Sequence, residues 1–380
     1  MSSGTLTLLG AGDIILGMPN PEKQFELVAP ILKSADVVVG QGEMPFTSRP
    51  VVTATKSAVA DPDGRARGCD PNNMKAFVTA GFNVIHLAGN HIWDSGIPGI
   101  EDTVNGLRDL GLAVVGAGMN IDEATKPAII ERQGTRFGFL SYNCVGPRET
   151  WASPVKPGCA YVKIITAYEL DHPTPGGPPA VYTFADPVTL KAMTDDIQKL
   201  RPLCDVLVVH FHKGMGFVPI KMALYDLQVS YAAIDAGADL ILAEHAHILK
   251  GIEQYKGRTI FHGLGNFVVG APPSAAPQEA MHPWLAQQRD KRLKEWFGVD
   301  TEGGRWHPEA KYTMIAKCII SGGKITRTSY IPCVINKMEQ PEVVKDERRQ
   351  QVFDYVEKIT RAAELNARFE WDGDEVLIRS

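Results

Sequence analysis

Short apolar runs alternate along the first part of the chain with longer segments in which apolar residues recur every three or four positions. The short runs are rich in β-branched residues and end near glycine, so they predict strands, whereas the longer spacing predicts helices. The predicted strands lie at 5–13, 36–43, 83–91 and 112–118. The predicted helices lie at 21–35, 71–82 and 97–111. Strands that alternate with helices in this way favour an α/β fold with parallel pairing.

The second half of the chain repeats this alternation and then changes to an antiparallel style. Helices are predicted at 187–204 and 224–238, and a last helix at roughly 345–367. Strands are predicted at 128–134, 136–143, 205–212 and 239–247. The segments expected to pair in antiparallel fashion are 251–266, 312–320 and 324–335.

Two segments interrupt the pattern. Residues 153–180 are rich in Pro and Gly and predict a long loop. Residues 271–311 combine charge and aromatic side chains with little apolar periodicity, which is typical of an inserted lid or interaction segment. No clean linker divides the chain, so 1–380 is expected to form a single large domain.

Composition narrows the class of protein. A hydrophobic share of 44% with 22% charged residues is that of an ordinary globular protein. The net charge of −5 is small and its signs are interspersed, which argues against a nucleic-acid partner. The sequence predicts neither a secretory signal nor a membrane span. Its six cysteines form no CxxC pair and are expected to be reduced thiols, which points to the cytoplasm.

Carboxylates and imidazoles follow the apolar strands where each strand ends. These residues are Asp13, Glu43, Asn90, His91, His210, His212, His245 and His247. The carboxyl edge of parallel strands is where ligands bind in open α/β sheets. Histidines two residues apart on an extended segment face the same side, so either HxH pair could reach a metal ion. Mixed oxygen and nitrogen ligands suit Mn, Fe, Co, Ni or Zn better than Ca or Mg.

Each of these residues also has a plainer interpretation. Asp13 could form a turn or cap a helix, Glu43 could be a surface carboxylate, and Asn90 could cap the helix that follows it. The recurrence of such residues at equivalent strand ends is harder to explain in this way. It therefore favours a metal centre.

The ordered set resembles a known family. The stretches "GAGDIILG", "GEMPFT", "HLAGNHIWDSG", "VVHFHKG", "GADLILAEHAHILKGIE" and "IFHGLGNFVV" are similar, in order, to the motifs of the CapA family of capsule and poly-γ-glutamate biosynthesis. That family resembles a branch of the calcineurin-like metallophosphoesterases, and the resemblance covers roughly residues 6–269. It implies a four-layer α/β/β/α sandwich with mixed sheets and a two-metal site at the strand ends.

The resemblance also implies a division of roles. Asp13 and His247 would bind one metal and Glu43 would bridge, whereas Asn90, His212 and His245 would bind the second metal. His91 would point at the substrate. Ile15 stands where the superfamily usually has a further histidine ligand, so one metal is expected to be held weakly or in another arrangement.

These features together favour a metal-dependent hydrolase with one or two divalent ions (Mn, Fe or Zn) that activate water. The substrate is expected to be a small anionic molecule with a phosphoester or a carbonyl bond (ester, lactone or γ-glutamyl amide). His91 is the candidate general acid, and Asp94 would orient it or would cap a helix. The candidates for substrate contact are His86, His210, Lys213 and Asn266.

Two other functions stay open on the sequence alone. The chain could be a poly-γ-glutamate or capsule biosynthesis factor, or a non-catalytic binding protein with a degenerate metal site. The missing histidine at Ile15 supports the degenerate site, and the Asn90–His91 pair argues against it. A homo-oligomer is compatible with the sequence, and no partner protein is implied by it.

Overall fold

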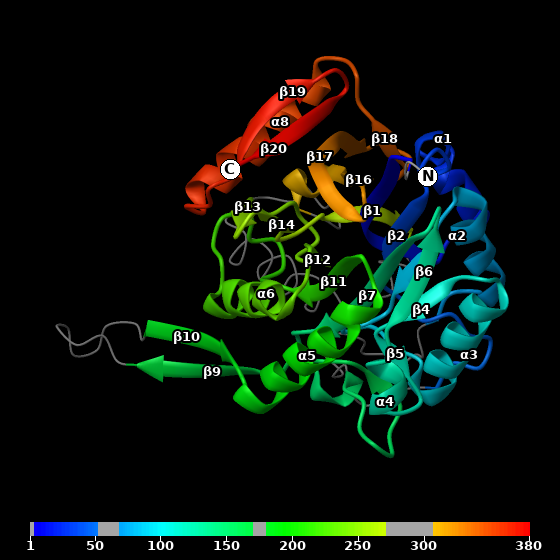
Figure 1. Ribbon diagram of the computed structural model, residues 1–380. Helices are drawn as coiled ribbons and strands as arrows, with labels where there is room; N and C mark the ends of the chain where they lie inside the picture. Colours follow the sequence, from blue (N-terminus) through cyan, green and yellow to red (C-terminus); the bar gives the residue numbers. More distant parts are fainter. Residues whose placement is uncertain (1–3, 52–67, 170–179, 271–306) are drawn as a thin grey trace, which may run out of the picture.

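The computed structural model describes residues 4–51, 68–169, 180–270 and 307–380 (Figure 1). Two mixed β-sheets, one of ten strands and one of six, form the centre of this part of the chain. The expected α/β class with mixed sheets is confirmed. Most of the segment expected to be a lid, 271–311, lies outside the described residues, which resume at 307.

The ten-stranded sheet has the order β19-β20-β17-β16-β1-β2-β3-β4, with β15 beside β1 and β18 beside β17. Its first strands are β1 (Leu6–Leu16), β2 (Val37–Gly42), β3 (Val84–His86) and β4 (Ala113–Val115). Its later strands are β15 (Asn266–Gly270), β16 (Tyr312–Ser321), β17 (Lys324–Ile335), β18 (Pro341–Val343), β19 (Arg368–Asp372) and β20 (Glu375–Arg379). Strands β1 to β4 pair in parallel, whereas β16 to β20 pair in antiparallel fashion.

The six-stranded sheet has the order β13-β14-β12-β11-β7-β6. Its strands are β6 (Ala128–Arg132), β7 (Thr135–Asn143), β11 (Val206–Lys213), β12 (Leu240–His245), β13 (Ile252–Tyr255) and β14 (Arg258–Phe261). The four central strands are parallel, and antiparallel β6 and β13 form the edges. The carboxyl ends of β7, β11 and β12 therefore lie side by side.

Alternate residues of the central strands enter different cores, because side chains of a strand point to opposite faces. Val206 and Val208 pack between the two sheets, together with residues of β1, β2 and β16. Leu207 and Val209 pack instead against helices α5 (Pro187–Leu200) and α6 (Leu224–Ala236). Helices α2 (Lys75–Ala80) and α3 (Gly96–Asp109) cover the outer face of the ten-stranded sheet (Figure 1).

Three local predictions need correction. The helix predicted at 21–35 is split into a 3-10 turn, η1 (Pro21–Phe25), and the single turn α1 (Ala29–Leu32), with Pro30 in the first turn of α1, where proline is tolerated. The loop predicted at 153–180 contains β8 (Gly158–Cys159) and β9 (Ile164–Glu169), and β9 forms a hairpin with β10 (Ala180–Ala185). The predicted last helix ends earlier, because α8 (Arg348–Ala362) is followed by the β19–β20 hairpin.

Two expectations from the sequence concern the state of the cysteines and the presence of membrane-spanning helices. All six cysteines are buried free thiols, as the absence of CxxC pairs led us to expect. None of the helices in the described part of the chain combines the length and the apolar character that crossing a membrane requires.

Candidate metal centre

Strand β1 changes its partner at Asp13. On one edge, Leu6 to Gly10 pair in antiparallel fashion with β16, and Asp13 to Leu16 pair in parallel with β15. On the other edge, the register with β2 shifts between Gly10 and Asp13. A Cβ on Gly12 would lie 2.0 Å from the carbonyl oxygen of Gly265, so the close approach of the two backbones requires glycine. This irregularity falls at Asp13, in the last part of β1.

The carboxyl-terminal parts of β1, β2, β3, β11 and β12, the loops that follow them and the first residue of β15 bring most of the side chains singled out from the sequence into one connected group. Every member lies within 3.8 Å of another. The members are Asp13, Glu43, Asn90, His91, Asp94, His212, His245, His247 and Asn266. They come from both sheets, so the group joins the two halves of the fold.

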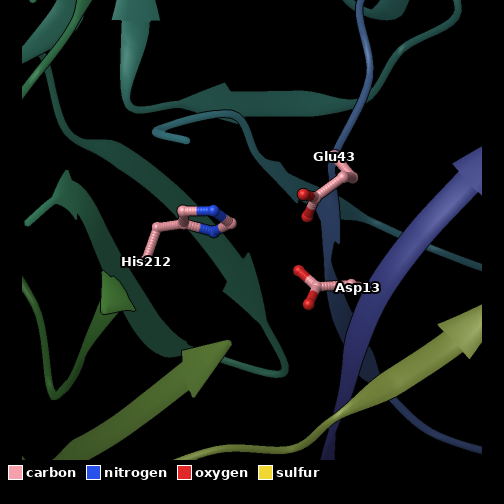
Figure 2. A group of neighbouring side chains, drawn as sticks. All are labelled: Asp13, Glu43 and His212. Carbon is pink, nitrogen blue, oxygen red and sulfur yellow. The ribbon is translucent and has the colours of Figure 1, made fainter. Parts of the chain in front are cut away.

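Asp13, Glu43 and His212 form the centre of this group. One ligand atom from each lies within 4.8 Å of the others. Figure 2 shows the two carboxylates beside each other with the His212 ring opposite them. When both carboxyl groups are ionised, both oxygens of Glu43, Oδ1 of Asp13 and Nδ1 of His212 are buried without a hydrogen-bond partner in the described residues. Buried polar atoms that lack a partner are costly, so these atoms are candidates to bind an ion or water.

The protonation equilibria agree with this interpretation. Burial raises the pKa of Asp13 to about 7; hydrogen bonding with the Glu43 carboxyl group opposes this rise, and the charge of Glu244 adds to it. Burial and the neighbouring Asp13 charge raise the pKa of Glu43 to about 8. Burial lowers the pKa of His212 well below its ordinary value, and the surrounding imidazoles lower it further, so the ring is neutral. Neutral imidazole next to two carboxylates is a donor set that fits a divalent transition metal.

The remaining imidazoles are oriented by specific partners. His212 Nε2 lies 2.7 Å from Asn90 Oδ1 and 3.1 Å from His245 Nδ1. The backbone N–H of His245 donates to Asp13 Oδ2 at 3.2 Å. His247 Nδ1 lies 2.8 Å from Asn266 Oδ1, which leaves its Nε2 facing Glu43 at 3.8 Å. His245 and His247 both have positive φ, 94° and 54°, a strained conformation that often accompanies functional sites.

His91 stands beside the carboxylates and is paired with Asp94. Its Nδ1 lies 2.7 Å from Asp94 Oδ2, and its Nε2 lies 3.6 Å from Glu43 Oε1. The side chain of His91 is 21% exposed, whereas that of Glu43 is fully buried. Ser95, not Asp94, occupies the N-cap position of α3. Asp94 therefore hydrogen-bonds His91 and is not the N-cap residue of α3.

The structure contradicts the expectation that Lys213 contacts the substrate. The Lys213 side chain is fully buried and points away from the carboxylates toward α6. Its ammonium group donates to the carbonyl of Asp226 and to Ser230 Oγ, both at 2.6 Å, and lies 3.1 Å from His262 Nδ1. Lys213 therefore ties β11 to the helix that follows it, and its charge is not available to a ligand.

His86, His210 and Asn266 are also misplaced for substrate contact, because each is at most 1% exposed. His86 and His210 lie behind the site with their ring centroids 4.4 Å apart. His210 bonds Ser141 and Glu244, whereas neither ring nitrogen of His86 has a partner in the described residues. Asn266 supports His247, as described above.

Glu244 and Phe217 also lie beside the site and were not predicted from the sequence. Glu244 precedes His245 in β12, is 1% exposed and hydrogen-bonds His210. Glu244 is two residues from Leu242 and four from Leu240, and side chains two apart in a strand share a face. Its position on the inter-sheet face of β12 could therefore have been predicted from the sequence. Phe217 stacks on His247 with ring centroids 5.7 Å apart. Nothing in the apolar pattern predicts that contact, since Phe217 lies in a loop.

The sequence and the fold were compared with known proteins. A family model described as bacterial capsule synthesis protein PGA_cap matches residues 7–271. The capsule biosynthesis protein CapA of Bacillus anthracis is 28% identical over 272 residues, which are 69% of this chain and 59% of that protein. The PGA biosynthesis protein CapA of Bacillus subtilis is 27% identical over 276 residues, 70% of this chain and 64% of that protein. Among solved structures, the calcineurin-like phosphoesterase YfkN from Bacillus subtilis shares 11% identity at a TM-score of 0.43, over 95% of this chain and 98% of that one.

Proposed function

The chain belongs to the bacterial capsule synthesis protein family, whose model matches residues 7–271, and from this premise we propose that it is a metal-dependent hydrolase. The proposed substrate is a small anionic molecule with a phosphoester or carbonyl bond. The chain spans less than two thirds of the length of the two CapA relatives, so the activity is assigned to the described site and not carried over from them.

The observation that carries the proposal is the set of unpartnered ligand atoms on Asp13, Glu43 and His212. A protein that needed this region only for stability would gain by pairing these atoms or by replacing them with apolar groups. The chain instead keeps two carboxylates with raised pKa side by side in a buried place. Such an arrangement is typical of a metal site. We propose one or two divalent ions of Mn, Fe or Zn.

Divalent ions of this kind, when bound, supply Lewis acidity that polarises a substrate oxygen and makes water more acidic. Asp13, Glu43 and His212 would hold them, with His245, His247 and Asn90 as further ligands. His247 is fixed for this purpose by Asn266 at 2.8 Å. The strained backbone of His245 and His247 is stabilised by the packed strands around it.

His91 is the residue proposed to handle a proton. Because Asp94 accepts the Nδ1–H of His91, the proton available for a leaving group is the one on Nε2. Partial exposure of the ring leaves it accessible to a substrate, whereas the carboxylates behind it are screened from solvent.

A second candidate function is that of a capsule or poly-γ-glutamate biosynthesis factor. The description of the family and the printed names of the two CapA relatives favour it. The two candidates are compatible if the bond that is cleaved is a γ-glutamyl amide. Six buried free thiols suit a reducing compartment, so we place the proposed activity in the cytoplasm.

The test is a substrate panel combined with two variants. Purified protein loaded with Mn, Fe or Zn is assayed on phosphoesters, carboxylic esters, lactones and γ-glutamyl amides. His91→Ala is expected to abolish turnover and to leave the metal content of the protein nearly unchanged, whereas Asp13→Asn should lose both. Wild-type protein that binds no metal under any loading condition would contradict the proposal.

A further inference from the structure

The loop between β11 and α6, which we call the strap (214–223), crosses the metal centre at His247. The Met215–Val218 turn at its centre is closed by a hydrogen bond of 3.3 Å from the N–H of Val218 to the carbonyl of Met215. Phe217 is the third residue of this turn and has a φ of 57°. Turns with positive φ at this position usually carry glycine or asparagine there. A phenylalanine at such a place strains the backbone, and the strain has to be offset by its surroundings.

The strap is fastened to the body of the protein at three points. The backbone N–H of Phe217 donates to the carbonyl of Ala246 at 2.7 Å, and the N–H of Gly214 donates to the hydroxyl of Tyr225 at 2.8 Å. The third point is Lys250, whose ammonium donates to the carbonyls of Val218 and Lys221, each at 3.0 Å. The first and third points lie on either side of His247 in the sequence.

Lys250 holds the strap at a cost in free energy, because its ammonium charge is buried. Its side chain is fully buried, and burial lowers the pKa of its ammonium group. Burial of a charged group is unfavourable unless hydrogen bonds compensate for the lost water. The two carbonyls of the strap provide this compensation, so the strap and the lysine stabilise each other. Residue 250 is three positions after His247, and the lysine therefore couples the strap directly to the segment that carries this histidine.

These attachments hold the ring of Phe217 against the ring of His247. The Phe217 and His247 rings are stacked at 26° with their centroids 5.7 Å apart. Asn266 holds the same imidazole by its Nδ1 at 2.8 Å. The hydrogen bond restricts where the ring can point, and the stacked phenyl group restricts rotation of the ring plane. Together they fix the direction in which Nε2 faces Glu43.

We propose that Phe217 is a positioning residue that sets the ring plane of His247 in the metal centre, and that Lys250 is the clamp that keeps Phe217 there. This inference rests on the proposed function, because it assumes that His247 is a metal ligand. The strap is thus a support for a ligand, and the strain at Phe217 is the consequence of placing a flat ring where the backbone favours glycine.

Metal affinity measured by titration with Co²⁺, together with the visible absorption of bound Co²⁺, tests the proposal. Phe217→Gly removes the ring and permits the positive φ, so the turn is kept or relaxed. We expect Co²⁺ affinity to fall about tenfold, the lower end for loss of a group that orients a ligand, and the absorption spectrum to change. Ile220→Ala, an exposed apolar change within the strap, is the matched control and should alter neither.

Lys250→Met keeps the length of the side chain and removes the ammonium. We expect it to reproduce the loss of Co²⁺ affinity, and the double variant with Phe217→Gly to add little, because both changes act through one ring. Phe217→Leu keeps apolar bulk without a flat ring and gives the same readout if the glycine variant folds poorly. Wild-type affinity and spectrum in a variant that lacks the ring would overturn the inference.

The same experiment separates the inference from the proposed function. Asp13→Asn should abolish Co²⁺ binding if the metal centre is where we place it. Loss of binding in Asp13→Asn with unchanged binding in Phe217→Gly would reject the role of Phe217 alone. Equal Co²⁺ binding by wild type and Asp13→Asn would reject the metal centre, and the inference with it.

Discussion

Replacement of Asp13 by asparagine is expected to stabilise the metal-free protein while it destroys the proposed metal site. The pKa of Asp13 is raised from 3.8 to about 7, so the folded state holds a proton that the unfolded chain has released. Between about pH 4 and pH 7 the unfolded state binds fewer protons, and wild-type stability therefore falls as the pH rises. At one pKa unit per 1.36 kcal/mol, the cost of the carboxyl group is about 1.5 kcal/mol at pH 5 and about 4 kcal/mol at pH 8.

Asparagine carries no charge and avoids this cost, so the gap between the two proteins should widen with pH. The measurement is urea unfolding with chelator present at pH 5 and pH 8, with the free energy of unfolding compared between wild type and Asp13→Asn. Any fixed cost of burying the amide cancels in the difference between the two pH values. Asp109→Asn, on the exposed side of α3, serves as the control. A gap of the same size at both pH values would refute the reasoning.

Three further changes have defined outcomes. His86→Phe should raise the free energy of unfolding by about 1–2 kcal/mol, because both ring nitrogens are buried without a partner; a loss of stability in urea would contradict this. Lys213→Met should lower the free energy of unfolding by about 2–3 kcal/mol, because Ser230 and two other partners lose their hydrogen-bond donor. The metal content should be unchanged. Gly12→Ala should cost about 1–3 kcal/mol and weaken metal binding, because its Cβ would lie 2.0 Å from the Gly265 oxygen; wild-type metal affinity would show that the backbones can separate.

Much of the alternating part of the fold could be predicted from the sequence, because strands buried on both faces are continuous apolar runs. Val206 to Val209 show this: all four are fully buried, two facing each core. The β9–β10 hairpin was missed because Pro and Gly near residues 170–179 dominate the local composition and hide the β-branched residues on either side. The alternation of apolar and polar residues does not reveal this hairpin, because few of its side chains pack into the core.

The candidate site, like the fold, could be predicted from the sequence only in part. Asp13, Glu43 and His212 could be grouped from the sequence because each follows an apolar run that predicts a strand, and parallel strands end at one edge. The direction of Lys213 could not be foreseen. It follows His212 directly, and only the position of α6 beside β11 decides that its ammonium meets Ser230. The ring of Phe217 over His247 likewise depends on a turn whose backbone conformation is unusual for its residue type.

The change of partner along β1 has a consequence for how the protein folds while the ribosome makes it. Leu6 pairs with Ile320, and Asp13 pairs with Asn266, so the strand that carries the first carboxylate is completed by segments far along the chain. At about 5–20 residues per second, a ribosome needs roughly 15–60 s to make that distance. Until then one edge of β1 stays unpaired and open to other chains. The long sequence separation between β1 and its partner strands predicts slow refolding.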